Sequence, residues 1–372
     1  MPTKFRGWAL KSVTRLASLA LVVAMVSAGC GNGSNGPPTQ PVLGLWEANL
    51  NNVLEFLNTH VAVNGNSAPE LIGNLPTPGF GAPQGVTFDS NGNLWVLDGG
   101  TVATGGTIPP TVDEFTTAQL PNLTNSGVAP KAVIGSADFG FPQQLGFDSS
   151  GNLWVSDAAN NEVFEFTPRQ LSGGTNVTPA LVLTSNPAFN GSLGIAFDSS
   201  GDLWIANNNL SGANGTIFEF SAAQLSGLSG AQTLVPNAIL QSNGTSISLP
   251  WALVFDSNGN LWVSNQDSTI NTVVQFSKGQ LAALTAAPTT PTPAVTISVI
   301  GSGSSMSIDA PTGLAIDSQN DLAVSNVNNS IAVFAFDQLM KSGSPSPEVF
   351  VAGSNTAINT PEGLAFSGGW KP

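Results

Sequence analysis

The stretch FDSNGNLWVLD, residues 88–98, decides the fold because it recurs along the chain. Close copies are FDSSGNLWVSD at 147–157, FDSSGDLWIAN at 197–207 and FDSNGNLWVSN at 255–265, and a looser copy, IDSQNDLAVSN, spans 316–326. Near-copies at a spacing of about 50 to 60 residues are typical of a repeat protein in which each copy marks one structural unit.

Each unit predicts four short strands, which we call strands A to D in chain order. In the second unit, strand A ends in LGFD (145–148), strand B is LWVSD (153–157), strand C is VFEF (163–166) and strand D is PALVLTS (179–185). Strands A and B are apolar at consecutive residues, as expected where both faces of a sheet are buried between neighbouring sheets. Four short strands per unit, separated by Gly and Pro turns, indicate a β-propeller blade.

The two ends of the chain supply the halves of one further blade. TPEGLAF (360–366) matches strand A, whereas LWEAN (45–49) and VLEF (53–56) match strands B and C. Joining them closes a ring and removes exposed sheet edges. We therefore predict an all-β, six-bladed β-propeller of four-stranded antiparallel blades, with the last blade closed by N- and C-terminal strands. A parallel β-helix is the alternative, although its repeats are usually far shorter.

The first 40 residues are predicted to lie outside the propeller. Four basic residues precede an apolar run at 16–26, which fits a secretory signal and is too short to span a bilayer. Ser-Ala-Gly is followed by Cys30, the only cysteine, and this resembles a bacterial lipobox. An ordinary cleavage site with an incidental cysteine is the alternative. The expected organisation is a lipoprotein signal peptide at 1–29, a flexible tether at 30–40 and the propeller at 41–372.

The charge balance restricts the partners. Beyond residue 29 the chain has five Lys and Arg against 23 Asp and Glu, a net charge of −18. This argues against nucleic acid and against electrostatic attachment to anionic lipid. We expect a monomer that attaches to the membrane through lipid on Cys30 and faces the periplasm or the cell surface, where an envelope protein, a glycan or a small molecule would be its partner.

The units also resemble a known family. Copies of P-x-G-[hydrophobic]-A-F-D-S-x-G-N-L-W-V followed by Asp or Asn are similar to NHL-type repeats, and the resemblance covers about residues 41–372. Wider relatives would be six-bladed gluconolactonase-type hydrolases and streptogramin-lyase-like propellers. The resemblance implies the propeller fold, which hosts many activities.

The acidic start of the repeated stretch has two interpretations. Asp89-Ser-Asn-Gly-Asn resembles the start of a Ca²⁺-binding loop, yet no copy supplies the terminal bidentate carboxylate that such loops use. A tight turn explains each position, because Asp bonds nearby backbone N–H groups and Gly92 adopts a positive φ. We favour the turn, and we interpret the Trp of the first four copies, which is Ala323 in the fifth, as packing between blades.

The end of strand B carries Asp or Asn in every unit. A ring of these side chains would bind a cation or a sugar, and the alternative is that each residue caps local backbone in its own turn. We favour the cap and keep the ring as a ligand-binding candidate. Its members are Asn49, Asp98, Asp157, Asn207, Asn265 and Asn326.

The start of strand A is where the resemblance implies a metal site. Gluconolactonase-type propellers hold a divalent metal there with Glu, Asn and Asp. Of the matching positions, only Glu362 carries such a side chain, and one carboxylate makes a poor metal site. The matching positions are Gln84, Gln143, Leu193, Trp251, Thr312 and Glu362.

Streptogramin-lyase-like chemistry would need a histidine base in the channel. The single histidine, His60, aligns instead with a residue that follows strand C on the outer rim, and the chain has no tyrosine. We therefore predict a non-catalytic, lipid-anchored binding module of the cell envelope, without a metal and with Ca²⁺ as the alternative cofactor. The alternative function is a divergent, lactonase-like hydrolase or lyase that uses Glu362 with Asp98 or Asp157 as its acid and base.

Overall fold

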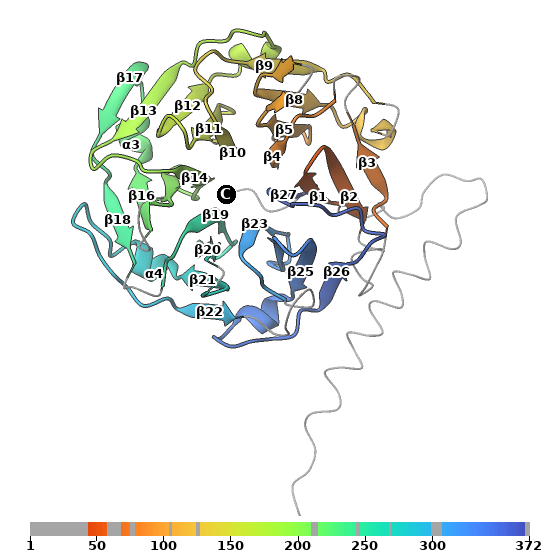
Figure 1. Ribbon diagram of the computed structural model, residues 1–372. Helices are drawn as coiled ribbons and strands as arrows, with labels where there is room; N and C mark the ends of the chain where they lie inside the picture. The colour runs from red at the N-terminus through yellow and green to blue at the C-terminus, as the bar shows by residue number, and fades with distance from the viewer. Residues whose placement is uncertain are drawn as a thin grey trace, which may run out of the picture. The chain divides into compact units, whose positions relative to one another are not determined.

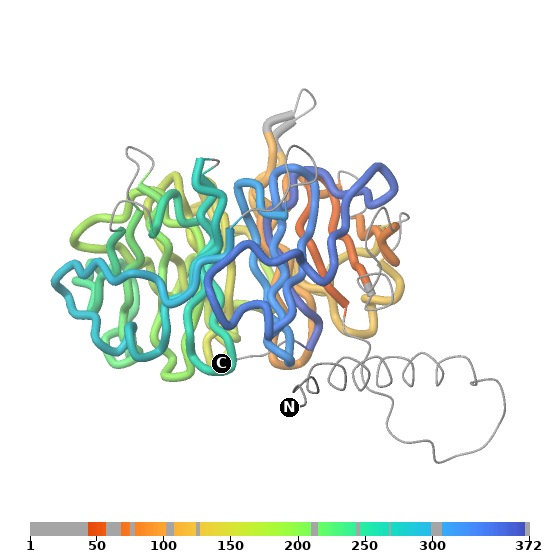
Figure 2. The backbone as a smooth tube through the Cα atoms, turned by 90° about the horizontal axis from the view of Figure 1, so that it is seen from below, coloured from red at the N-terminus to blue at the C-terminus, as the bar shows by residue number. Residues whose placement is uncertain are grey.

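The computed structural model describes residues 44–57, 68–74, 79–103, 106–123, 127–209, 215–242, 246–267, 269–298 and 307–368. Six sheets stand around a central axis as the blades of a ring (Figure 1), and Figure 2 shows the same blades from the side. The predicted six-bladed all-β propeller is confirmed. The signal peptide, the tether, Cys30 and His60 lie outside the described residues.

Each blade runs outward from its innermost strand, strand A, to strand D. Blade 1 consists of β27 (Leu364–Phe366), β1 (Gly44–Asn49), β2 (Asn52–Leu57) and β3 (Leu71–Gly73). Blade 2 consists of β4 (Pro83–Phe88), β5 (Leu94–Asp98), β8 (Thr111–Phe115) and β9 (Ala132–Gly135), and the hairpin of β6 (Thr101–Ala103) and β7 (Gly106–Ile108) follows β5. Blade 3 consists of β10 (Pro142–Phe147), β11 (Leu153–Asp157), β12 (Glu162–Phe166) and β13 (Leu181–Ser185).

The other three blades repeat this order. Blade 4 consists of β14 (Ser192–Phe197), β15 (Leu203–Asn207), β16 (Thr216–Phe220) and β18 (Ala238–Gln241). Blade 5 consists of β19 (Pro250–Phe255), β20 (Leu261–Asn265), β21 (Thr272–Phe276) and β22 (Val295–Ser298). Blade 6 consists of β23 (Pro311–Ile316), β24 (Leu322–Asn326), β25 (Ser330–Phe334) and β26 (Val349–Ala352).

Blade 1 is the split blade, and it closes the ring as predicted. Strand β27 pairs antiparallel with β1, with Leu45 opposite Phe366 and Glu47 opposite Leu364. The amide of Gly44 also bonds the Ser367 hydroxyl at 2.7 Å, across 323 residues of sequence. The two ends of the propeller are therefore joined by hydrogen bonds and side-chain packing without a covalent turn, whereas a covalent turn links strands A and B of the other blades.

The repeated acidic stretch forms the turn between strands A and B. In blade 2, Asp89 Oδ1 accepts the amides of Asn91 and Asn93, its Oδ2 accepts the Trp95 indole N–H at 3.2 Å, and Gly92 has φ of 78°. The Trp95 ring packs edge-on against Phe147 of the next blade at 5.5 Å between centroids. The predicted turn and the predicted packing between blades are both confirmed.

In blades 2 to 6, the segment between strands C and D carries a short helical turn. These are η1 (Leu120–Asn122), η2 (Gln170–Ser172), α3 (Ala222–Leu225), α4 (Lys278–Leu281) and η4 (Phe336–Leu339). After α3, strand β17 (Gly230–Leu234) pairs parallel with β13 of the preceding blade. Isolated bridges such as Leu240 to Thr289 make the same link elsewhere, so a repeat covers the outer edge of the blade before it. None of the described helices is long and apolar enough to cross a membrane.

Candidate functional site

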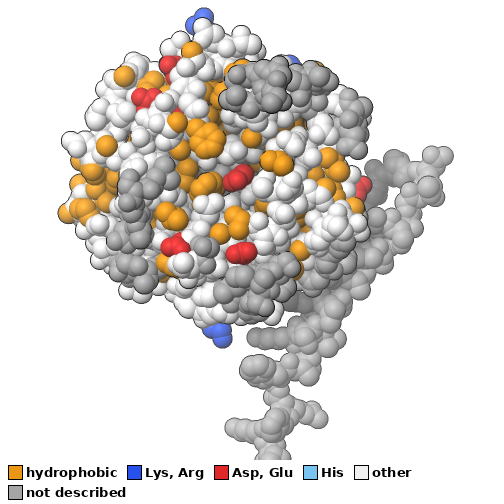
Figure 3. Space-filling view, viewed as in Figure 1, with side chains coloured by type: hydrophobic (Ala, Val, Ile, Leu, Met, Phe, Trp, Pro, Cys, Tyr) orange, Lys and Arg blue, Asp and Glu red, His pale blue; other side chains and the backbone are white. Residues whose placement is uncertain are grey.

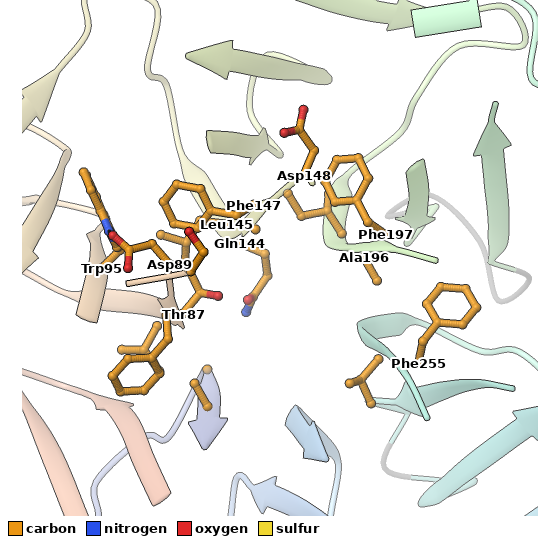
Figure 4. A pocket seen from close by; sticks show the side chains of 18 of the residues that line it. Thr87, Asp89, Trp95, Gln144, Leu145, Phe147, Asp148, Ala196, Phe197 and Phe255 are labelled. Atoms are coloured by element: carbon orange, nitrogen blue, oxygen red, sulfur yellow. The ribbon is translucent and has the colours of Figure 1, made fainter. Parts of the chain in front are cut away.

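The six innermost strands enclose a cavity of about 920 Å³ at the centre of the ring. Its wall runs from the glycine near the start of strand A to the turn between strands A and B. Figure 4 shows Gln144 near the middle of this wall, with Phe147, Phe197 and Phe255 set around it. The cavity therefore presents amide and hydroxyl groups beside aliphatic and aromatic surface, which is the usual composition of a small-molecule site.

Three of the four acidic side chains that line the cavity are occupied by their own turns, and the fourth, Glu114 in β8, accepts the Asn93 side-chain amide at 3.1 Å. Asp148 Oδ1 accepts the amides of Ser150 and Asn152, and its Oδ2 accepts the Asn152 side chain at 2.8 Å and the Trp154 indole at 3.0 Å. Asp89 and Asp198 repeat this arrangement with their own turns. Carboxylates that already accept three or four hydrogen bonds are poorly placed to serve as metal ligands or as bases.

Close backbone contacts narrow the channel at the far end of the cavity. A Cβ on Gly194 would lie 2.5 Å from the Trp251 carbonyl oxygen, and one on Gly363 would lie 2.8 Å from the Gly85 Cα. At the same level the register between strands A and B shifts in blades 2 to 6. Bulges of this kind redirect a side chain. Here each bulge follows the Pro or Ser that begins strand A, and the next residue lies at the end of the channel opposite the cavity.

The strand-A candidates lie at this second end. Gln143 is buried and donates to Gln84 Oε1 at 3.4 Å, which links blades 3 and 2. The Thr312 hydroxyl donates to the Pro361 carbonyl at 2.7 Å, which links blades 6 and 1. Leu193 is buried. These residues form a ring around the channel, and their polar groups mostly bind neighbouring blades.

In this ring, Glu362 and Trp251 contact each other although blade 6 lies between their two blades. Glu362 belongs to blade 1 and Trp251 to blade 5, and the Trp251 side chain nevertheless hydrogen-bonds the Glu362 carboxyl. Burial raises the pKa of Glu362 to about 7, and the bond to Trp251 opposes that rise. The enclosed Oε2 of Glu362 has no hydrogen-bond partner within the described residues. A carboxyl with a raised pKa beside an indole has the features of a proton donor or a ligand-binding group.

The strand-B candidates act on the loop that precedes strand A of the same blade. Asp157 is fully buried, and its carboxylate accepts the amides of Gly140 and Phe141 from that loop and of Ala159 and Asn160 from its own turn. Asp98 does the same in blade 2, where it accepts the amides of two loop residues and of Gly100 in its turn. Both carboxylates thus hold two loops together.

The asparagines at this position accept the same loop amides, and their side-chain NH₂ groups also donate a hydrogen bond. In Asn265, Oδ1 accepts the amide of Ser248 at 3.1 Å and the side-chain amide donates to the Thr272 hydroxyl at 2.9 Å. The Oδ1 atoms of the others accept amides of the equivalent loop. The pairs are Asn49 with Asn359, Asn207 with Asn190, and Asn326 with Asp309. The structure therefore brings the six residues to equivalent places and directs them at backbone groups of their own blades.

The sequence predicts candidate sites at the ends of strand B and at the start of strand A, and it does not predict the cavity. The cavity is lined by strand A and by the turns between strands A and B, for which the sequence indicates a structural role. Gln144 and Thr87, two polar residues that line it, lie in strand A. The glycine in P-x-G and the small residues near it were the available signal, because they leave space around the axis.

Charge and metal-binding groups are sparse around the site. On the face seen in Figure 3, uncharged polar and apolar side chains dominate, and acidic side chains are few and scattered. Among the described residues, no group of three His, Cys, Asp or Glu side chains is arranged to hold a metal ion. Glu362, Asp98 and Asp157 form no common cluster of that kind.

Comparison with known proteins gives the fold and no family. No protein-family model and no curated protein matches the chain. Among solved structures, a streptogramin B lyase is 16% identical with a TM-score of 0.39, covering 71% of this chain and 68% of that one. An inactive virginiamycin B lyase from Staphylococcus aureus with quinupristin is 15% identical with a TM-score of 0.39, covering 71% and 70%.

A further solved structure aligns over more of the chain. A protein of unknown function from Bacteroides caccae is 9% identical with a TM-score of 0.53, covering 88% of this chain and 99% of that one. At this identity the similarity concerns the propeller fold.

Proposed function

We propose that this protein is an exported, lipid-anchored propeller that binds an uncharged, partly apolar small molecule or glycan end in its central cavity. The observation that carries the proposal is the cavity itself, whose volume of about 920 Å³ lies in the range of small-molecule sites. The lipid anchor is inferred from Cys30 and the signal-like segment before it.

The lining supports an uncharged ligand. Among the described residues, no Lys, Arg or His lines the cavity. The carboxylates of Asp89, Asp148 and Asp198 are held by their turns, and Glu114 accepts a hydrogen bond from Asn93. The available groups are the Gln144 amide, the Thr87 hydroxyl and the serine hydroxyls of the turns, together with aliphatic and phenyl surface. Such groups recognise hydroxyl- and carbonyl-bearing molecules by hydrogen bonds and by stacking.

A fluorescent neutral probe of suitable size, N-phenyl-1-naphthylamine, tests the cavity. The wild-type chain should bind it with a saturable rise in fluorescence, and Ala196→Phe, which fills the cavity wall, should weaken binding at least tenfold. Val235→Phe adds the same ring at a site with 54% exposure and should leave binding unchanged. Gly146→Val is the milder filling variant, since Val254 occupies the same column in blade 5. Equal binding by all variants would place the probe outside the cavity.

The anchor is tested separately by fractionation. Wild-type protein should be recovered with membranes, and Cys30→Ser should be recovered in the soluble fraction. Recovery of both proteins in the same fraction would refute the anchor and leave the cavity proposal standing. We also propose that no metal takes part, and stoichiometric Ca²⁺ in the purified protein would refute this.

A second candidate function is a hydrolase or lyase with Glu362 as its acid. The raised pKa of Glu362 and its unbonded Oε2 favour it. Hydrolysis of aldonolactones by the purified chain is the assay. Activity that disappears in Glu362→Gln would favour the enzyme, and activity that survives in this variant would remove Glu362 from the mechanism.

A further inference from the structure

Two carboxyl groups are buried in the propeller without the partners that buried acids usually have. Glu47 in β1 is fully buried, and neither of its carboxyl oxygens has a hydrogen-bond partner within the described residues. Asp113 in β8 is 1% exposed, and the Thr111 hydroxyl donates to it at a long 3.4 Å. Neither residue belongs to the cavity or to the channel ring.

Both acids belong to the same cross-strand pair of the repeat, which joins the middle residue of strand B to its partner on strand C. Glu47 pairs with Leu54 across β1 and β2, and Val96 pairs with Asp113 across β5 and β8. These are the central positions of strands B and C. The same two positions carry apolar pairs in the other four blades, namely Val155 with Phe164, Ile205 with Phe218, Val263 with Val274, and Val324 with Ala332. An acid has thus replaced a core residue in two blades only.

The two acids lie on either side of the split blade. Glu47 shares its face of β1 with Leu45, which packs into the core between blades 6 and 1. Asp113 lies beside Val96 on the face that packs against Trp46 of blade 1. The blade that is closed by noncovalent contacts, without a turn between strands A and B, is therefore also the blade with a buried acid in each of its two interfaces.

Among the described residues, the strands around Glu47 and Asp113 carry no positive charge. The strands of blades 1, 2 and 6 contain no Lys or Arg, and those of blade 6, which face Glu47, contain no ionisable residue. Glu55 pairs with Trp46 and so lies on the opposite face of blade 1, turned towards blade 2. Asp113 faces the carboxylate of Asp98. Burial raises the pKa of Glu47 well above its ordinary value, and burial together with Asp98 raises the pKa of Asp113 to about 7.

We propose that the split blade is a pH-controlled closure of the ring, shut while Glu47 and Asp113 are protonated and loosened when they ionise. The direction follows from linkage, since a carboxyl with a raised pKa in the folded state stabilises that state most at low pH. The stabilisation declines as the pH rises above about 4, the ordinary pKa of these groups, and is lost as the pH passes the folded values. Blade 1 should then open before blades 3 to 5, which carry apolar residues at this cross-strand pair.

Hydrogen exchange of the full chain at pH 5.5 and pH 8.5 tests the closure. Protection of residues 44–57 in blade 1 is compared with that of residues 261–276 in blade 5 within the same sample, which cancels the effect of pH on intrinsic exchange. We expect the blade 1 to blade 5 ratio of protection factors to fall at least tenfold at pH 8.5, since one unit of pKa shift corresponds to a factor of ten. In Glu47→Val with Asp113→Val the fall should be clearly smaller than in the wild type, and ionisation of Glu55 and Glu362 in blade 1, whose pKa values burial also raises to about 7, accounts for what remains.

Two further variants keep the result decisive. Glu47→Gln preserves the shape of the side chain and should reduce the fall even if valine disturbs the packing. Glu165→Gln removes a half-buried acid from blade 3 and should leave the fall as in the wild type. A ratio that does not change with pH in the wild type, or one that changes equally in the double variant, would overturn the proposal.

Discussion

Replacing Asp157 by alanine separates a structural role from a ligand-binding role at the end of strand B. The buried carboxylate accepts four backbone amides. Two of these donors, on Ala159 and Asn160, lie in an exposed turn and can bond water after the change. The other two, on Gly140 and Phe141, lose the group that holds the loop before strand A.

The magnitude follows from the two loop donors. A hydrogen bond to a charged group contributes about 1.5 kcal/mol or somewhat more, so Asp157→Ala should lower the free energy of unfolding by ~3 kcal/mol. Asp157→Asn keeps one acceptor oxygen and should cost ~1–2 kcal/mol, which is consistent with the asparagines that serve at this position in four other blades. Urea unfolding followed by tryptophan fluorescence measures both differences.

A matched control is available in the same loop. Asp138 is exposed, and Asp138→Ala should change the free energy of unfolding by less than ~0.5 kcal/mol. If Asp157→Ala were as stable as the control, the carboxylate would not be holding the loop. Loss of ligand binding without loss of stability would then restore the ring of strand-B residues as a binding site.

Three other changes probe the repeat and the channel. Trp154→Phe removes the indole bond to Asp148 and should lower the free energy of unfolding by ~1 kcal/mol, with an unchanged spectrum of secondary structure. Ser264→Ala leaves the Ala252 amide and a carbonyl of blade 6 without the hydroxyl that bridges them and should cost ~2 kcal/mol in urea unfolding, whereas a mutation of equal size at an exposed serine should not. Glu362→Gln removes a carboxyl whose pKa is raised to about 7, so its stability should exceed that of the wild type increasingly from pH 5 to pH 8, by up to ~3 kcal/mol; a constant difference across that range would contradict the assignment.

The fold could be predicted because the repeat carries its own local rules. The turn of Asp89 and Gly92 needs only a side chain that accepts two backbone amides and a residue that adopts a positive φ. Both requirements can be recognised in the amino-acid sequence. The closing blade was visible because LWEAN and TPEGLAF are each half of a unit. Local chemistry that recurs in register is enough to count blades and to locate their closure.

The site was harder to predict because its contacts join distant segments. The role of Asp157 depends on amides 16 and 17 residues upstream, in loops whose sequences differ from blade to blade. The approach of Trp251 to Glu362 depends on the curvature of the whole ring, which no local pattern encodes. The buried acids were visible in principle, since Glu47 stands in a column of Val and Ile when the units are aligned by strand pairing.

The closing pair of strands also fixes an order of events during synthesis. Strand β1 is made first among the strands of the propeller and β27 last, so β1 has no inner neighbour until nearly the whole chain exists. Contacts of such long sequence separation form slowly, and an unpaired strand edge is open to pairing with other chains in the meantime. The first repeat to leave the ribosome is therefore the last to be completed, and it is the part of the nascent chain with the greatest need of protection from aggregation.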